Sequence, residues 1–87
     1  MNRIISKQFI VLRIITPTSK KTIYRINKEI RLKLLLARIC VDQNLRVQDW
    51  MFINESTGKR INPVLSCVTQ GIADKDFIIM LQNATSG

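Results

Sequence analysis

The run at residues 30–44, IRLKLLLARICVDQN, constrains the fold most, because it is the one segment long and apolar enough for a core helix. A helix turns by about 100° per residue. This spacing aligns one apolar stripe that we expect to face the core: Leu32, Leu35, Leu36, Ile39 and Cys40. We expect Asn44 to end the helix in a left-handed conformation, and Asn27 is the nearest residue that could cap its start.

A second apolar row runs along the opposite side of the same predicted helix and consists of Ile30, Leu34, Ala37 and Val41. Single apolar residues are ordinary on protein surfaces, so the row is compatible with a helix face that is merely half exposed. It is equally compatible with a contact surface for a partner. The sequence leaves both interpretations open.

The length and composition predict one small domain with a single core, since the chain has 87 residues, of which 46% are hydrophobic and 23% charged. No segment approaches the roughly 18 apolar residues of a membrane-spanning helix. The first seven residues also lack the order of charge, apolar run and cleavage site that marks a signal peptide. We therefore expect a nuclear or cytoplasmic protein without a membrane partner.

The residue types argue against enzymatic and metal chemistry. The chain has no His, and its two cysteines, Cys40 and Cys67, are too few for a zinc site. A cysteine nucleophile needs a neighbouring base, so we expect both thiols to be buried apolar groups. The three glycines are too far apart for a phosphate-binding loop. We predict a protein that is not an enzyme and holds no metal or cofactor.

The net charge of +8 favours acidic partners, such as nucleic acid, anionic surfaces or acidic protein segments. The basic residues are spread along the chain rather than clustered, and aromatic residues are only 6% of the sequence. The sequence therefore shows no surface of basic and aromatic side chains on which bases could stack. A non-specific, basic nucleic-acid-binding module is therefore the less favoured alternative.

Segments rich in β-branched residues predict five strands around the helix. We expect the strands at residues 9–16, 22–27, 50–53, 59–61 and 77–82, with a single helical turn at residues 66–70. This order is typical of the β-grasp, an α+β roll in which a mixed sheet of four or five strands packs on one helix. The expected organisation is a flexible segment at residues 1–8, one domain at 9–82 and a flexible tail at 83–87.

Strand alternation predicts an unusual second face for this sheet. If Ile10, Leu12 and Ile14 face the helix, the opposite face carries an apolar patch formed by Val11, Met51, Ile53, Ile79 and Leu81. A sheet face in contact with water normally shows polar residues. We therefore expect this patch to bind a partner protein, a second copy or the rest of a longer host protein.

In this order of elements the chain resembles ubiquitin-like proteins, and among them it is most similar to SUMO. The resemblance rests on FIVLRII, TIYRI, WMFIN, QGIADKDFI and LQNATSG, in that order along residues 9–87. It implies a small protein that other proteins recognise. In ubiquitin-like proteins generally, the open sheet face is a major docking surface.

The resemblance also implies a peptide groove. In SUMO-like proteins a hydrophobic peptide with acidic flanks adds a strand beside the second strand, against the helix. By position, the groove would be lined by Tyr24, Arg25, Ile26, Leu35 and Ile39, with Arg25 meeting the acidic flank. The same apolar residues would serve equally well as core. Three nearby positions that are usually basic in SUMO hold Asn27, Leu34 and Asp42, which weakens the expected attraction for acids.

The end of the chain bears on which of two kinds of ubiquitin-like protein the resemblance implies. Conjugated modifiers end in Gly-Gly, whereas this sequence ends in Ser86 and Gly87. The side chain of Ser86 adds bulk where glycine allows a close approach. The resemblance implies either a covalent modifier, attached through Gly87 by SUMO-type activating and conjugating enzymes, or a non-conjugated adaptor domain of a larger protein or complex.

Overall fold

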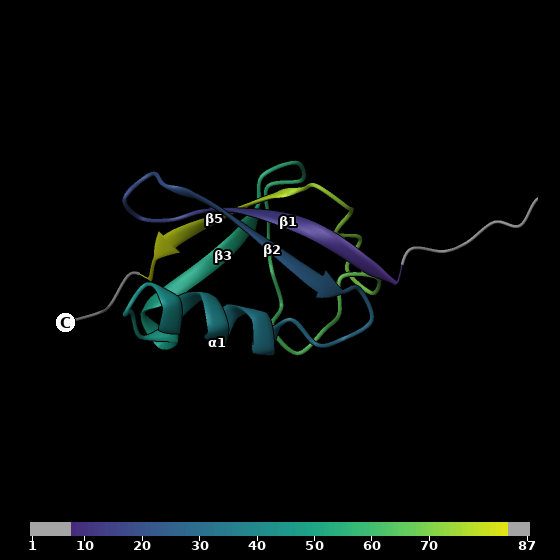
Figure 1. The fold of residues 1–87 in the computed structure, drawn as a ribbon, viewed down its shortest axis with the longest axis horizontal. Helices are drawn as coiled ribbons and strands as arrows, with labels where there is room; N and C mark the ends of the chain where they lie inside the picture. Colours follow the sequence, from purple (N-terminus) through teal and green to yellow (C-terminus); the bar gives the residue numbers. More distant parts are fainter. Residues whose placement is uncertain (1–7, 84–87) are drawn as a thin grey trace, which may run out of the picture.

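The computed structural model describes residues 8–83 and shows one helix packed along one face of a curved sheet (Figure 1). The predicted α+β β-grasp architecture is confirmed. Of the segments expected to be flexible, residues 1–7 and 84–87 lie outside the described residues. The elements in chain order are β1 (Phe9–Ile15), β2 (Lys21–Asn27), α1 (Lys33–Asp42), the 3-10 helix η1 (Val47–Asp49), β3 (Trp50–Asn54), β4 (Lys59–Arg60) and β5 (Phe77–Gln82).

The sheet has the strand order β2-β1-β5-β3-β4. The central pair, β1 and β5, is parallel, and the other three pairs are antiparallel. This arrangement makes β2 one edge of the sheet and the two-residue strand β4 the other edge. Edge strands present backbone groups that a further strand can use.

The core lies between α1 and the inner face of the sheet. The five residues of the predicted helix stripe are all buried, which confirms that helical spacing identified the core face. They pack with alternate residues of three strands, namely Ile10, Leu12, Ile14, Phe52, Ile78 and Met80. The second apolar row is different, because Ile30, Leu34 and Val41 are 42%, 62% and 74% exposed.

Helix α1 begins three residues later than the sequence predicted, and Asn27 does not cap it. The residue at its start is Leu32, which makes no capping bond with its side chain. Instead, the N–H groups of Leu32 and Lys33 donate to the carbonyl oxygens of Leu65 and Pro63, at 2.9 and 2.8 Å. A distant loop therefore satisfies the first donors of the helix, and local sequence gives no sign of that.

The end of the helix was predicted better than its start. Asn44 has the expected left-handed conformation, with φ of 59°, although the helix itself ends at Asp42. The N–H of Leu45 then donates to the carbonyl of Cys40 at 2.8 Å, which satisfies a terminal acceptor. The turn predicted at residues 66–70 consists of one long helical bond, from Gln70 to Ser66 at 3.4 Å, and does not extend into a helix.

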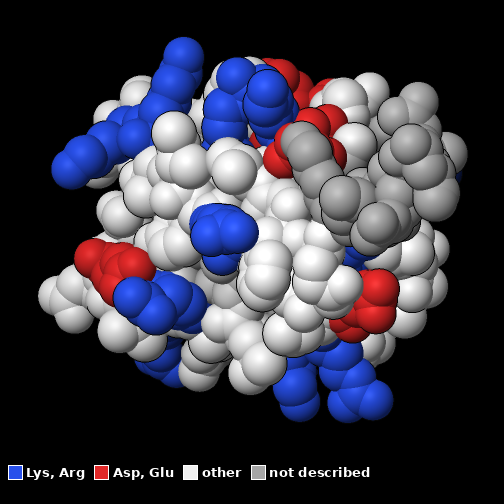
Figure 2. Space-filling model, turned by 45° about the vertical axis from the view of Figure 1, so that its right-hand side comes forward, with Lys and Arg blue, Asp and Glu red and all other residues white. Residues whose placement is uncertain are grey.

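On the face of the molecule that Figure 2 shows, basic side chains stand at several separate positions, one of them within a broad uncharged area, with fewer acidic ones between them. No helix in the described part of the chain is long and apolar enough to cross a lipid bilayer.

Candidate functional site

The open face of the sheet brings four of the five predicted patch residues together. Directly paired residues of adjacent strands share a face. Register pairs Met51 with Leu81 and Ile53 with Ile79, so these four side chains form a block on β3 and β5. Val11 lies on the same face but away from this block, because β1 meets Ile79 at Ile15 and Arg13 stands between Ile15 and Val11. Leu81 is 44% exposed and the other four are half-buried.

The apolar face is wider than the predicted patch. Register adds Ile15, which pairs with Ile79, and Phe77, which pairs with Arg13. It also adds Ile23 of the edge strand β2, which is 66% exposed. The predicted patch did not include Ile23. Pairing the first two strands as a simple hairpin would have placed Ile23 opposite Arg13, on the open face of the sheet.

Basic side chains stand among these apolar residues. The Arg13 guanidinium lies 3.8 Å from the centre of the Phe77 ring, and its Nε donates to the Lys75 carbonyl at 2.9 Å. The Arg25 guanidinium lies 4.8 Å from the ring centre of Phe9. Stacking on aromatic rings holds the cationic groups beside the apolar surface. The five strands of the described sheet contain no acidic residue, so the face is both apolar and basic.

A shallow groove of about 300 Å³ lies between the edge strand β2 and α1. Of the five residues expected there, Tyr24, Arg25, Ile26 and Leu35 line it. Ile39 does not line it, because its place at the centre of the helix stripe leaves it fully buried. Two residues that were expected only near the groove also line it, namely Asn27 and Leu34, together with three that the sequence did not place there: Phe9, Ile30 and Arg38.

Tyr24 marks one end of this groove. Its hydroxyl donates a 2.6 Å hydrogen bond to Oδ2 of Asp42, at the last residue of α1. Burial and this bond to a carboxylate raise the pKa of Tyr24 to about 12. The side chain is therefore neutral at physiological pH and links the edge strand to the helix.

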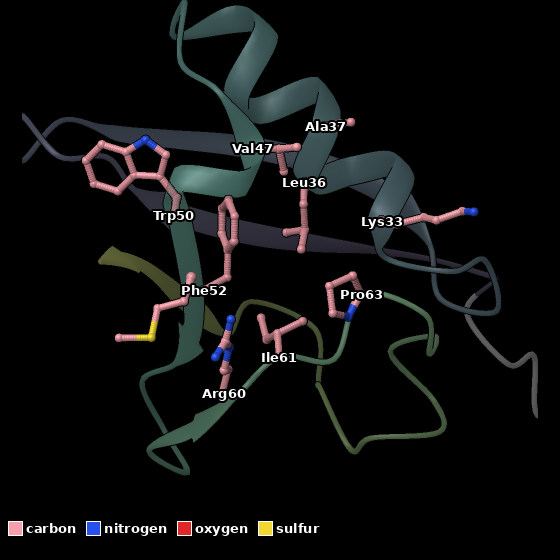
Figure 3. Close-up of a pocket in the computed structure, with 10 residues that line it drawn as sticks. Lys33, Leu36, Ala37, Val47, Trp50, Phe52, Arg60, Ile61 and Pro63 are labelled. Atoms are coloured by element: carbon pink, nitrogen blue, oxygen red, sulfur yellow. The ribbon is translucent and has the colours of Figure 1, made fainter. Parts of the chain in front are cut away.

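A second cavity, of about 240 Å³, lies on the other side of the helix, against β3 and β4 (Figure 3). Sequence reasoning missed it, because it depends on how the chain after β4 leaves the sheet. The lining residues are mostly apolar and come from four elements and the loop that follows β4: Lys33, Leu36, Ala37, Val47, Trp50, Met51, Phe52, Arg60, Ile61 and Pro63.

The two cysteines are buried, as the sequence predicted. Burial raises the pKa of the Cys40 thiol. Burial and the nearby Asp76 carboxylate raise the pKa of the Cys67 thiol to about 11, so it is protonated at neutral pH. No cluster of three or more metal-ligating side chains occurs within residues 8–83.

No protein-family model matches the sequence, and no curated protein matches it. Solved structures match the fold. The N-terminal ubiquitin-like domain in the 4931431F19Rik protein, determined in solution, has a TM-score of 0.74 at 17% identity, covering 99% of this chain and 86% of that one. A de novo design based on ubiquitin has a TM-score of 0.80 at 9% identity, covering 93% of this chain and 96% of the design. At these identities the likeness establishes the ubiquitin-like β-grasp fold.

Proposed function

We propose that this chain is a non-enzymatic ubiquitin-like module that acts by binding other proteins through the open face of its sheet. The observation that carries the proposal is the register of β3 and β5, which places Met51, Ile53, Ile79 and Leu81 side by side where a solvated sheet normally shows polar residues. Contiguous exposed apolar surface of this kind marks interaction sites.

The charges around the patch indicate the kind of partner. Arg13 and Arg25 lie on the same side of the sheet as the patch, and Arg60 pairs with Ile53 at its other margin. A partner surface with an apolar centre and an acidic rim complements this arrangement. Such complementarity raises the association rate and suppresses basic partners.

The test compares two variants that add the same charge at different places. Ile53→Lys with Ile79→Lys alters the sheet face, whereas Leu34→Lys with Val41→Lys alters the exposed row of α1. Each immobilised chain is incubated with cell extract, and bound proteins are quantified by mass spectrometry. We expect a set of proteins that the sheet-face variant loses and the helix variant keeps. Equal retention by both variants, with folding verified by circular dichroism, would contradict the proposal.

A more specific form of the proposal is a SUMO-like modifier. The groove beside β2 supports it, since an edge strand next to a hydrophobic groove is the arrangement that strand-adding peptides use. Residues that favour acidic peptides also line this groove, namely Arg25 and Arg38. Attachment would use Gly87, which lies outside the described residues.

A thioester assay separates the modifier from the adaptor. The chain is incubated with ATP and the SUMO-activating and conjugating enzymes, alongside Ser86→Gly. If the chain is a modifier, its unaltered form becomes attached to the enzymes through a thioester that reducing agents cleave. Mass spectrometry should then find Gly87 in an isopeptide bond to lysines of target proteins. If only Ser86→Gly is charged, the adaptor is favoured. The adaptor also has support from the comparison, because one similar structure is the N-terminal domain of its protein.

A further inference from the structure

The cavity between α1 and the β3–β4 edge, called here the β4-side pocket, has an apolar floor. Leu36 of α1, Phe52 of β3 and Ile61 after β4 form the floor and are each no more than 3% exposed. Trp50 and Pro63 stand at its sides (Figure 3). The three floor residues belong to the core and Trp50 packs against it, so the pocket is a preformed feature rather than a gap between loops.

The pocket exists because strand pairing stops early at this edge. β4 has two residues, and after it the Ile61 N–H makes one more bond to β3, donating to the Phe52 carbonyl at 2.7 Å. The chain then turns toward the helix, where the Pro63 carbonyl accepts from the Lys33 N–H at 2.8 Å. The first part of β3 is left without a neighbouring strand on this side. Hydrogen bonds therefore fix both walls of the pocket.

The margins of the pocket are cationic. Arg60 on β4 and Lys33 on α1 both line it, and the Lys33 ammonium extends outward from the helix, away from the cavity (Figure 3). Neither side chain forms an ion pair with another described residue, and no acidic residue is among those described as lining the pocket. Two cationic side chains that have no ion-pair partner among the described residues therefore border an apolar cavity. A ligand that complements this arrangement has an apolar centre and an acidic group on either side.

We propose that the β4-side pocket binds one large apolar side chain, with tryptophan the best fit, from a protein segment that carries carboxylates on both flanks. The volume favours a side chain over a small molecule, since about 240 Å³ falls below the roughly 300–1,000 Å³ of typical small-molecule sites. Tryptophan is one of the three residues enriched at the centres of interfaces, with tyrosine and arginine, and it is the largest apolar side chain among them. Flanking carboxylates would meet Arg60 and Lys33 outside the cavity.

The net charge argues against a second copy as the occupant. Each chain carries +8, so two copies repel each other. The pocket shares Met51 with the block on the open sheet face and Arg60 with the margin of that block, but Ile53 and Ile79 do not line it. Substitutions at Ile53 or Ile79 therefore separate binding at the sheet face from binding in the β4-side pocket.

The test titrates the isotope-labelled full chain with pentapeptides whose termini are capped. Binding is monitored by changes in the amide chemical shifts of the protein. The acidic peptide Glu-Asp-Trp-Asp-Glu should shift the amide signals of Leu36, Ala37 and Trp50. Replacing its Trp by Ala should weaken binding by at least about tenfold. The charge-inverted peptide Lys-Arg-Trp-Arg-Lys should bind at least about tenfold more weakly.

Two pairs of variants locate the binding. Lys33→Glu with Arg60→Glu should reduce affinity for the acidic peptide by at least about tenfold, while Arg31→Glu with Lys59→Glu, an equal change in net charge, should reduce it by less than about threefold. Ala37→Trp should block the pocket, whereas Val41→Trp, on an exposed position of the same helix, should not. Unchanged amide spectra elsewhere verify that each variant folds.

Several results would overturn the proposal. Equal losses from the two charge variants would mean general attraction to a basic chain, and shifts confined to the β2–α1 groove or the sheet face would assign the peptide there. A concentration-dependent dimer abolished by Ala37→Trp would make a second copy the occupant. Ile79→Lys should leave peptide affinity unchanged, so that failure of this proposal and failure of the proposed sheet-face function are distinguishable.

Discussion

The hydroxyl of Tyr24 on β2 donates a 2.6 Å hydrogen bond to the carboxylate of Asp42 at the end of α1. The other oxygen of this carboxylate lies 3.5 Å from Nε of Arg38. The charge of Asp42 is therefore engaged within the molecule. The carboxylate therefore links the two walls of the β2–α1 groove and opposes an acidic peptide less than a free Asp would.

We predict that the single tyrosine of the chain titrates late. Burial and the bond to Asp42 raise the pKa of Tyr24 to about 12, against about 10 in an unfolded chain. This contribution to folding stability is complete below about pH 10 and is lost as the pH rises from about 10 to 12. Ultraviolet absorbance of tyrosinate measures the midpoint. Asp42→Asn should lower it, and a wild-type midpoint at the ordinary value would contradict the structure.

We predict that the two apolar rows of α1 differ sharply in their effect on stability. Leu36 is 3% exposed in the core, whereas Leu34 is 62% exposed two residues earlier. Leu36→Ala should lower the free energy of unfolding by about 2–5 kcal/mol. Leu34→Ala should change it by less than about 0.5 kcal/mol. Urea unfolding followed by circular dichroism measures both, and similar losses would show that the outer row is buried.

The fold could be predicted because its signals are local. Alternation in β1 places Ile10, Leu12 and Ile14 in the core, and helical spacing does the same for Leu36 and the rest of the stripe. The same alternation identified the apolar side of the sheet, since each strand carries its own two-residue period. Sheet register then brings residues of different strands together, and the order of the elements indicates which strands pair.

The remaining features depend on contacts between distant segments. The start of α1 is set by the carbonyls of Leu65 and Pro63 rather than by Asn27. The β4-side pocket arises where the chain leaves the sheet at Pro63. No local pattern in the sequence reports these tertiary relationships.

We predict that Cys67 does not react with thiol reagents in the folded protein. Its side chain is fully buried, and burial together with Asp76 raises its pKa to about 11. The thiolate is the reactive form and is therefore scarce at neutral pH. A small disulfide reagent should label the Cys67 thiol only in denaturant, and mass spectrometry detects the labelled protein. Rapid labelling of Cys67 without denaturant would mean that the loop around it opens readily.

We predict that any binding to nucleic acid is weak and independent of base sequence. The charge of +8 attracts phosphates, but the rings of Phe9 and Phe77 on the open face are each already stacked against a guanidinium, of Arg25 and Arg13. Affinity for two unrelated DNA duplexes should be equal and should fall steeply as salt rises. Fluorescence anisotropy measures this dependence. Tight binding to one duplex at physiological salt would instead favour a nucleic-acid-binding module.

We predict that Asn54, a buried polar residue at the end of β3, stabilises the fold through its side chain. Its Oδ1 accepts from the N–H and hydroxyl of Ser56, and its Nδ2 donates to Asp76 at 3.2 Å. Asn54 is 3% exposed, so water cannot readily replace these partners. Asn54→Ala should lower the free energy of unfolding by about 1–3 kcal/mol.

The matched control for Asn54 is Ser56→Ala, which removes one hydroxyl donor and leaves the Nδ2 bond to Asp76 in place. Its cost should be smaller, about 0.5–1.5 kcal/mol, because Asn54 Oδ1 still accepts from the Ser56 N–H. Chemical denaturation of the two variants under identical conditions gives the comparison. Equal costs would mean that the hydroxyl bond alone matters, and that the link from β3 to Asp76 just before β5 adds nothing to stability.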